Sequence, residues 1–584
     1  MRINYSKNNI NKLFLNLLPA QIISSITTSL SGIVNGYVIG NYLSSMDMVA
    51  LGFVSPLIQV IGMLSSIVSG GARILSGEYI GRGDKNKSRE TFTASMYILL
   101  VLGVVITICG LLFSSGIAKL FGANGSSLLS ASSYIKGLSI GFLPTMINPC
   151  LMIFLQMEND SNYALFSTFI LALSNYVLAL IGMKYLHVGM FGIGIITAMS
   201  HYITFIILFI RFVQKKDYPR IGRYVFSNIY KEIIILGFPC ALAGCLYAFR
   251  NIQLNKFAFS IHGEDAVHAL SILNSSCGPL DAFNAGVGST LLMMASIYVG
   301  EKDNESIKRL IKTTIKYGVI IAMCKLCLIS LFAKRLAIAY GASSQVAYLT
   351  NELYIHYGIT MPFNIITITL TNINQSLKRI SYVNILIIFN AMINPLGYIL
   401  ISKGALGINA VWSCFWVAEI ITICIVLIVA CIHNKGPVHD LDNLIYLEDS
   451  IKLEENFTIS IRNIEEVSKV SREIELFCIE NDIDKKRSML AGLCCEEITS
   501  NIIEHGFSKC KKTKDKSIDI YVGVSDNEVN IRIKDNAVAF DPHIKIQNNN
   551  DDPTINIGIR VVSKIAKEMN YQNTFGLNVL TIKL

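Results

Sequence analysis

Tyr79-Ile80-Gly81 with Asp84, and Tyr298-Val299-Gly300 with Asp303, are two versions of one motif, separated by about 219 residues. Other landmarks recur at nearly the same offset: Pro19 with Pro239, Gly122-Ala123 with Gly341-Ala342, Pro144 with Pro362, and Asn175 with Asn394. A constant register over this length is typical of transporters built from duplicated halves. The sequence therefore predicts two copies of one structural unit.

Each copy contains apolar runs that are long enough to span a bilayer. The chain has 584 residues, 52% of them hydrophobic, and a mean hydropathy of +0.50, which is too apolar for a wholly soluble protein. We expect all-α polytopic membrane spans near residues 12–34, 46–70, 93–115, 133–155, 163–184 and 191–213, then 232–254, 267–292, 313–333, 352–374, 381–401 and 408–432. The prediction is a bundle of 12 helices in two six-helix repeats. The first run lacks a signal-peptide cleavage pattern, so we expect it to be retained.

Basic residues between the spans predict the orientation. They concentrate in alternate loops: Arg82, Lys85, Lys87, Arg89; Arg211, Lys215, Lys216, Arg220, Arg223; Lys302, Lys308, Arg309, Lys312, Lys316; Lys378, Arg379. The positive-inside rule then places both termini in the cytoplasm of a multi-pass plasma-membrane protein. Because the net charge of +9 comes from these juxtamembrane loops, we expect no nucleic-acid partner. The expected partners are the lipid bilayer and a small-molecule substrate.

Residues 10–432 resemble the multidrug and toxic compound extrusion (MATE) family of antiporters. The resemblance depends on ordered motifs: Pro19, Ile33-Val34-Asn35-Gly36-Tyr37-Val38-Ile39-Gly40, the two Tyr-x-Gly loops with Asp84 and Asp303, and Asn175 with Asn394. It implies two lobes around a central cavity, alternating access, and export driven by H+ or Na+ as the coupling ion. One position departs from the family pattern. Asn35 stands where many prokaryotic members have an aspartate, and an amide neither titrates nor carries a full negative charge.

Four ionisable residues fall inside apolar spans: Arg250, Asp281, Lys325 and Glu419. Such residues are costly in hydrocarbon and usually face a cavity or a partner. One interpretation is that Arg250 snorkels to an interface and that Lys325 or Glu419 pairs internally. The other is that Asp281 helps to bind the coupling ion or the substrate. The transport-cavity candidates are therefore Asn35, Asp281, Lys325 and Arg250.

The sequence pattern changes after Cys431. Asn434-Lys435-Gly436-Pro437 ends the last apolar helix, and we expect a linker up to about residue 455. Beyond it we predict strands at 457–461, 517–524, 528–534 and 578–583, and helices at 464–480, 486–507 and 557–569. This is an α+β sandwich, an open sheet with helices on one face. The predicted organisation is 1–213, first transporter half; 214–231, cytoplasmic linker; 232–433, second half; 434–455, linker; and 456–584, tail domain.

Glu497, Asn501 and His505 follow one another at intervals of four residues in the second tail helix. In an α-helix this spacing stacks them on one face. An amide oxygen one turn from a carboxylate can ligand Mg2+ while the carboxylate orients a hydroxyl or a water. The alternative for the triad alone is an ordinary solvated helix face.

Residues 456–584 resemble the histidine-kinase-like ATPase family, most closely the serine kinases that act as anti-sigma factors. The Glu-x-x-x-Asn pair and three downstream segments carry the resemblance: Asp535-Asn536-Ala537-Val538-Ala539-Phe540-Asp541-Pro542, Gly558-Ile559-Arg560-Val561-Val562 and Gly576-Leu577-Asn578-Val579-Leu580. It implies ATP with Mg2+, Glu497 as the catalytic residue, Asn501 as the metal ligand, and nucleotide binding by Asn501, His505, Asp535, Gly558 and Gly576. Ala537 and Asn556 replace glycines of the family pattern.

Two functions remain open at this point. The first is a secondary-active exporter regulated by a cytoplasmic ATP-binding domain. The second is a membrane-anchored serine kinase that uses the bundle as a sensor and phosphorylates an anti-anti-sigma-like protein. No Gly-x-x-x-x-Gly-Lys-Ser/Thr motif is present, so we do not expect ATP to drive the transport stroke itself. Kinases of this type commonly dimerise, so a homodimer through the tail domain is a further expectation.

Overall fold

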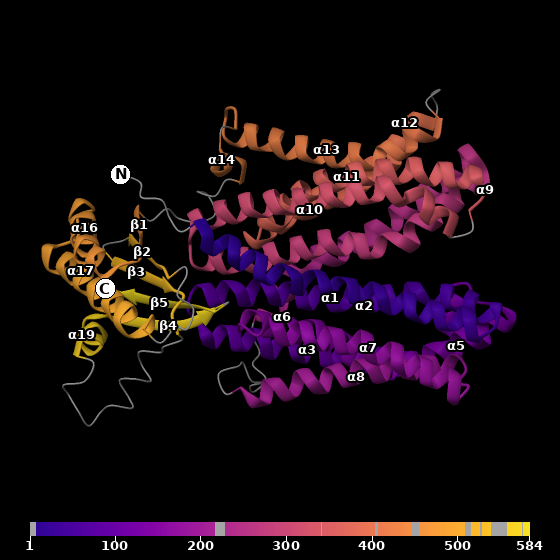
Figure 1. Ribbon diagram of the computed structural model, residues 1–584, viewed down its shortest axis with the longest axis horizontal. Coiled ribbons are helices and arrows are strands. Elements are labelled where there is room, and N and C mark those ends of the chain that lie inside the picture. The colour runs from indigo at the N-terminus through magenta and orange to yellow at the C-terminus, as the bar shows by residue number, and fades with distance from the viewer. Residues whose placement is uncertain are drawn as a thin grey trace.

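The computed structural model describes residues 7–215, 228–339, 342–402, 407–438, 440–445, 455–508, 516–525, 528–538, 557–574 and 576–584. A long bundle of helices carries a small domain with a sheet at one end (Figure 1). We call this end of the bundle the domain-side end. Residues 216–227 of the first predicted linker, and residues 439 and 446–454 of the second, lie outside the described residues, as do Gly341 and Asn556.

The first half consists of helices α1 to α8. Their bounds are α1 Lys7–Tyr42, α2 Ser45–Gly81, α3 Lys85–Leu112, α4 Ser114–Leu120, α5 Gly125–Ser139, α6 Phe142–Met157, α7 Ser161–Tyr185 and α8 Met190–Gln214. The predicted span at 133–155 is bent, because α5 and α6 meet at 49°. Asp84 caps α3 by accepting a hydrogen bond from the Lys87 amide at 3.0 Å.

The second half consists of α9 to α13. Their bounds are α9 Ile229–Gly300, α10 Asn304–Ala339, α11 Ser344–Ser376, α12 Ile380–Ser402 and α13 Gly407–His433. Two predicted spans lie in α9, and Gly263 separates them with a φ of 62°, which L-residues rarely adopt. Among the described residues, seven helices are long and apolar enough to cross a membrane, or nine if each bent pair is one span. The mostly helical, two-repeat fold is confirmed.

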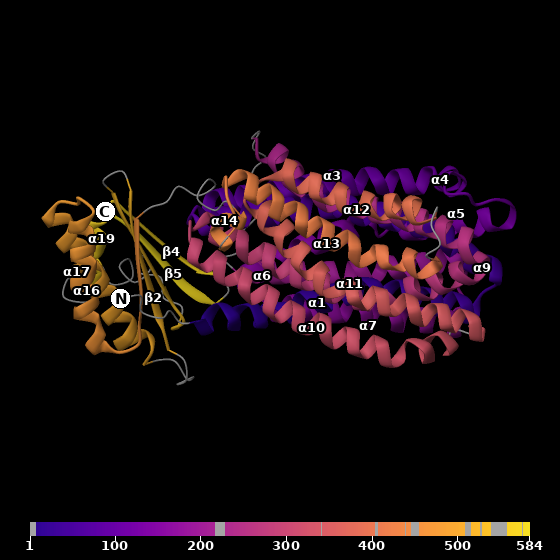
Figure 2. The same ribbon diagram turned by 90° about the horizontal axis from the view of Figure 1, so that it is seen from above.

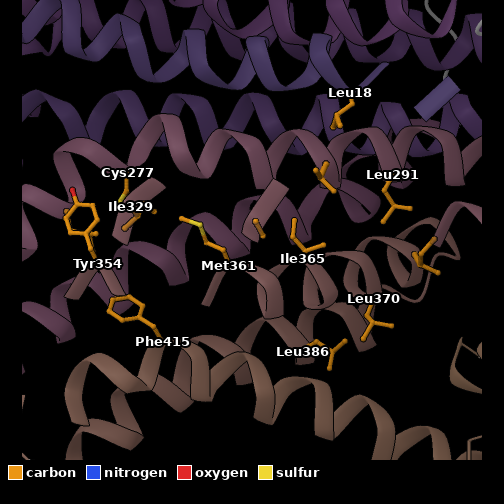
Figure 3. Packing of buried hydrophobic residues seen from close by; sticks show 14 of the residues in the cluster. Leu18, Cys277, Leu291, Ile329, Tyr354, Met361, Ile365, Leu370, Leu386 and Phe415 are labelled. Carbon is orange, nitrogen blue, oxygen red and sulfur yellow. The ribbon is translucent and has the colours of Figure 1, made fainter. Parts of the chain in front are cut away.

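The hydrophobic core of the second half is assembled from several helices. Figure 3 shows its side chains between the ribbons, and the labelled ones come from six helices: Leu18 of α1, Cys277 and Leu291 of α9, Ile329 of α10, Tyr354, Met361, Ile365 and Leu370 of α11, Leu386 of α12, and Phe415 of α13. α1 thus packs into the core of the other half. Apolar packing of this kind positions the few polar side chains of the interior.

The two halves touch through small residues of α2 and α9. A Cβ on Gly81 would collide with the Ile297 carbonyl, and one on Gly300 would collide with the Glu78 carbonyl. Gly81 and Gly300 are equivalent positions of the repeated motif, so the repeats meet about their pseudo-symmetry axis. Small residues let helix backbones approach this closely.

The tail domain has an antiparallel sheet with strand order β1-β2-β3-β5-β4. Its elements are β1 Glu455–Ile461, η1 Ile464–Glu466, α16 Val467–Glu480, α17 Lys485–Asn501, the π-helix η2 Ile502–Gly506, β2 Ile518–Ser525, β3 Glu528–Asp535, α19 Ile557–Ile565, β4 Glu568–Thr574 and β5 Leu577–Lys583. The short helix α14 Leu441–Ile445, which precedes the domain, packs on the bundle. The predicted helix at 557–569 is too long, and the edge strand β4 was not predicted. β4 has a weak alternation of exposed and buried residues, which explains why its pattern is hard to recognise.

The helices α16, α17 and α19 cover one face of the sheet, and the other face is turned toward the bundle (Figures 1 and 2). The alternation of β3 shows the two faces: Ile531 and Ile533 are fully buried in the domain core, whereas Arg532 and Lys534 contact the bundle. The architecture expected for the tail domain, an α+β sandwich with helices on one face, is confirmed.

Candidate functional sites

Asn35 lies in a buried polar cluster in the first half. Its amide nitrogen is 3.2 Å from the Tyr134 hydroxyl and 3.3 Å from Thr197 Oγ1, so three helices, α1, α5 and α8, contribute. Among the described residues, Asn35 Oδ1 has no hydrogen-bond partner, and neither has either polar side-chain atom of the buried Asn175. The cluster offers amide and hydroxyl groups but, at Asn35, no carboxylate. The sequence reasoning missed Tyr134 and Thr197.

Lys325 and Asp281 lie near each other in the second half. The Lys325 ammonium donates to the Leu280 carbonyl at 3.0 Å and to Asn284 Oδ1 at 2.6 Å, while the Tyr357 hydroxyl donates to Asp281. Lys325 is therefore held one residue from the aspartate on α9. A buried lysine with such partners is typical of a functional position in a membrane interior.

The polar contacts continue from Asn284 across the second half to Glu419. Asn284 donates to Asn364 at 2.9 Å, and Asn364 donates to Glu419 Oε1 at 2.9 Å. Asn390 donates to Glu419 Oε2 at 3.2 Å. The chain runs over α9, α11, α12 and α13, so residues distant in sequence form one network. The sequence reasoning selected Asp281, Lys325 and Glu419 but missed the linking asparagines, which single polar residues in apolar spans could have signalled.

Arg250 lies apart from these hydrogen bonds. Its guanidinium carbon is 4.8 Å from the Tyr247 ring centroid and 5.5 Å from that of Phe415. These distances are those of cation–π contacts. Among the described residues its Nε has no hydrogen-bond partner, and the two rings are the contacts described for its guanidinium group.

In the tail domain, Glu497 and Asn501 share the last turn of α17. The Asn501 amide nitrogen donates one hydrogen bond to the Glu497 carbonyl at 2.6 Å, which orients the side chain on its own helix and leaves its oxygen able to accept or to ligate. His505 does not complete a regular α-helical stack. It is exposed and lies in the π-helical turn η2, which changes its direction relative to Asn501.

Asp535 ends β3 inside the domain, where it is 6% exposed. Its Oδ1 accepts hydrogen bonds from the Ala537 amide and from Asn578 Nδ2, both at 2.8 Å. Burial raises the pKa of Asp535 to about 6, although these two bonds act in the opposite direction. Both hydrogen bonds described for this carboxylate go to Oδ1, so Oδ2 can accept from an amino group.

The two glycines of the predicted site lie in different places. A Cβ on Gly558 would collide with Oε2 of Glu497, so the first turn of α19 and the Glu497 carboxylate are in direct contact. Gly576 lies in the β4–β5 turn with a φ of 80°, and its ideal Cβ would be 3.0 Å from Asn159 Oδ1 of the bundle. The structure therefore brings Gly558 to Glu497 and places Gly576 against the bundle.

The described part of the chain contains no group of three or more His, Cys, Asp or Glu residues arranged to hold a metal ion. A Mg2+ ion at Asn501 would need ligands from the nucleotide phosphates.

Comparison with known families separates the chain into the same two parts. The MatE family matches residues 20–181 and 239–399. The chain belongs to the MatE family. Its tail, residues 462–584, matches the histidine kinase-like ATPase domain, a type of domain that implies ATP binding. The two MatE segments correspond to the two halves of the bundle.

Individual relatives agree with this assignment. The chain is 20% identical over 345 residues to the probable multidrug resistance protein YoeA of Bacillus subtilis, a match that covers 57% of this chain and 74% of that protein. It is 24% identical over 262 residues to the multidrug export protein MepA of Staphylococcus saprophyticus, covering 43% and 57%. A solved multidrug resistance MATE family transporter, described as outward-facing, superposes with a TM-score of 0.66 at 21% identity and covers 72% of this chain and 94% of its own.

Proposed function

We propose that this MatE protein is a secondary-active exporter of small molecules, driven by an H+ or Na+ gradient and regulated by its tail domain. The observation that carries the proposal is the match of both halves to one transporter family, with relatives named for multidrug resistance and export. These matches favour an exporter over a sensor kinase. The basic loops support an orientation in which the domain-side end faces the cytoplasm.

Coupling is assigned to the second half. Asn35 cannot release a proton, whereas Glu419 shares a chain of hydrogen bonds with Lys325, and Asp281, held by Tyr357, follows the Leu280 carbonyl that the same lysine contacts. A carboxylate in such a network can alternate between binding a coupling cation and pairing with the lysine. Arg250 and Lys325 add positive charge to the interior, which reduces its preference for cationic substrates relative to a cavity lined by acids.

The tail domain is proposed to bind ATP with Mg2+. Asp535 fits the adenine amino group because its buried carboxylate has an oxygen able to accept. Asn501 fits a metal ligand because a hydrogen bond from its amide nitrogen to the helix orients the side chain and leaves its oxygen able to ligate. Gly558 fits a close approach at the N-terminus of α19, where backbone amides favour phosphate. Glu497 would orient a hydroxyl or water, and His505 and Gly576 have peripheral roles.

The test is a flux measurement on the purified full chain in liposomes. A fluorescent organic cation such as ethidium and an anionic dye would be followed under an imposed pH gradient or Na+ gradient, each without ATP. Gradient-dependent movement of either dye supports the exporter. Absence of flux under both gradients, with correctly folded protein, would remove the proposal.

A further inference from the structure

The tail domain touches both halves of the bundle at once. Toward the second half, Lys534 of β3 pairs with Glu301 and, at 3.2 Å, with Asp303, and Arg532 donates to the Glu301 carbonyl. Toward the first half, an ideal Cβ on Gly83 would be 3.5 Å from Cβ of Asn570 in β4. One hydrogen-bonded sheet therefore bridges loops that belong to different repeats.

The contact with the second half is buried and charged. The Glu301 side chain is 2% exposed, and those of Asp303 and Lys534 are 14% exposed. Burial alone would lower the pKa of Lys534, but the carboxylates of Glu301 and Asp303 outweigh it and raise that pKa above its usual value. Lys534 also lies 5.0 Å from the Tyr298 ring centroid, within the repeated Tyr-x-Gly motif. Removing one partner of such a cluster leaves a buried charge unpaired, which is strongly unfavourable.

The contact with the first half involves a second loop as well. Asn159, between α6 and α7, faces Gly576 of the β4–β5 turn. Asn159 itself has a φ of 63°, so this loop makes a tight turn toward the sheet. The α2–α3 loop with Gly83 and the α6–α7 loop with Asn159 thus form the first-half side of the interface.

The two halves are also in close contact on the bundle side of this interface. Gly71 of α2 and Gly237 of α9 pack so tightly that a Cβ on either would collide with a carbonyl of the other helix, Ile233 or Ile67. Glu78 of α2 forms an ion pair at 2.6 Å with Lys378 after α11, which joins the two halves. The sheet therefore lies over a tightly packed junction between the repeats.

We propose that the docked tail domain is a clamp that holds the domain-side ends of the two halves together, so that the transporter opens to that side only after the sheet lifts away. Alternating access separates the loops of the two halves, and a rigid sheet cannot follow both. The clamp rests on the proposed exporter function, because it regulates that transport cycle. The clamp uses the sheet face opposite α16, α17 and α19. The proposed nucleotide site lies on the helix side of the sheet, so a nucleotide could bind while the domain is docked and change the strength of docking.

Cys240 provides a direct probe of the junction. An ideal Cβ on Gly70 would be 2.9 Å from the Cys240 sulfur, so this thiol lies where α9 packs on α2. The full-length protein in nanodiscs would be treated with N-ethylmaleimide, and the labelling rate of each cysteine would be read by peptide mass spectrometry. Cys109, exposed on α3, serves as a reference, and Cys478, fully buried in the tail-domain core, reports unfolding of that domain.

Two charge reversals break the clamp from opposite sides: Lys534→Glu in the sheet and Glu301→Lys in the bundle. Each should increase the Cys240 labelling rate at least about tenfold while Cys109 and Cys478 are unchanged, because each places like charges in a buried contact. The swap of both residues should restore slow labelling. Lys486→Glu, on the exposed start of α17, is the matched control and should have no effect.

The outcomes separate the clamp from the exporter. Unchanged Cys240 labelling in Glu301→Lys, whose tail domain has its native sequence, would overturn the clamp. If the protein transports dye but neither charge reversal changes the dye flux or the Cys240 labelling rate, the exporter function is supported and the clamp is excluded. If both reversals accelerate Cys240 labelling but no variant moves dye under either gradient, the clamp stands as a conformational contact and the exporter falls.

Discussion

Lys534 and Asp535 are consecutive residues of β3 whose side chains lie on opposite faces of the tail-domain sheet. Lys534 forms ion pairs with Glu301 and Asp303 of the bundle, whereas Asp535 accepts a hydrogen bond from Asn578 within the domain. Strand geometry alone requires this alternation. Because Asp535 is also the proposed adenine acceptor, a single peptide unit connects the nucleotide site to the contact with the transporter halves.

Replacement of Asp535 by Asn should stabilise the ligand-free tail domain at neutral pH. The pKa of Asp535 is raised by burial from 3.8 to about 6, so ionising it in the folded state costs about 3 kcal/mol relative to the unfolded chain. Because the pKa is raised in the folded state, the contribution of Asp535 to wild-type stability is fully present below about pH 4 and is lost as the pH rises through 6. The advantage of Asp535→Asn should therefore grow between pH 4 and 6 and then stay constant.

Unfolding of the domain at each pH can be followed through alkylation of the buried Cys478. Asp482→Asn is the control, because Asp482 is exposed and its φ of 61° suits asparagine equally well. A stability difference between wild type and Asp535→Asn that does not vary with pH would contradict the assigned burial effect.

Gly558→Ala should weaken nucleotide binding by displacing the Glu497 side chain. The added methyl group would collide with the Glu497 carboxylate, the far end of a flexible side chain, which must then leave the position it holds against α19. Isothermal titration of the full-length protein with Mg2+ and ATP should then give at least about tenfold weaker binding, a loss of about 1.4 kcal/mol. Gly116→Ala, where the space around the Cβ is open, should bind ATP as the wild type does. Equal affinities for Gly558→Ala and wild type would exclude this close contact from the binding site.

Lys378→Gln should loosen the junction between the halves without touching the tail domain. Glu78 is 6% exposed on its side chain, and losing Lys378 leaves it only Arg82 on its own helix as an ionic partner among the described residues. Because Lys378 is itself 38% exposed, the expected effect is modest, about 1–2 kcal/mol. The Cys240 labelling rate should rise several-fold, and Lys119→Gln, on exposed α4, should leave it unchanged. A rate in Lys378→Gln equal to wild type would mean that this ion pair does not hold the junction.

Asp281→Asn should reduce gradient-driven dye flux at least about tenfold, because it removes a carboxylate from the polar network around Lys325. Glu264→Gln removes an exposed carboxylate from the same long helix and should retain flux. Flux would be measured in liposomes across a range of pH. Wild-type rate and pH dependence in Asp281→Asn would exclude Asp281 from coupling.

The sequence predicts the repeated architecture well because the motif pairs and apolar runs are local features with strong periodicity. Gly81 and Gly300 illustrate its limit: their duplication is visible in the sequence, but their contact across the pseudo-symmetry axis is not. β4 was missed because an edge strand with weak alternation carries little signal. The predicted helix over that segment was therefore too long.

For the site residues too, local spacing is predictable from the sequence, whereas contacts between separate elements are not. The spacing of Glu497 and Asn501 places them on one helix turn, as predicted, but the π-helical turn that redirects His505 depends on tertiary packing. Lys325 and Asp281 are recognisable as ionisable residues in apolar spans, whereas the asparagines that connect Lys325 to Glu419 come from separate helices. The ion pair between Lys534 and Glu301 joins residues 233 positions apart in the sequence, and no local pattern predicts it.

The most direct test of the account compares energy sources in the Glu497→Ala, Asn501→Ala double variant. Liposomes containing this variant or wild type would be given either an ion gradient without ATP or Mg2+ and ATP without a gradient, and dye movement would be recorded. The account predicts gradient-driven flux in both proteins and no flux with ATP alone. Flux that requires ATP hydrolysis, and that disappears in the double variant, would contradict it.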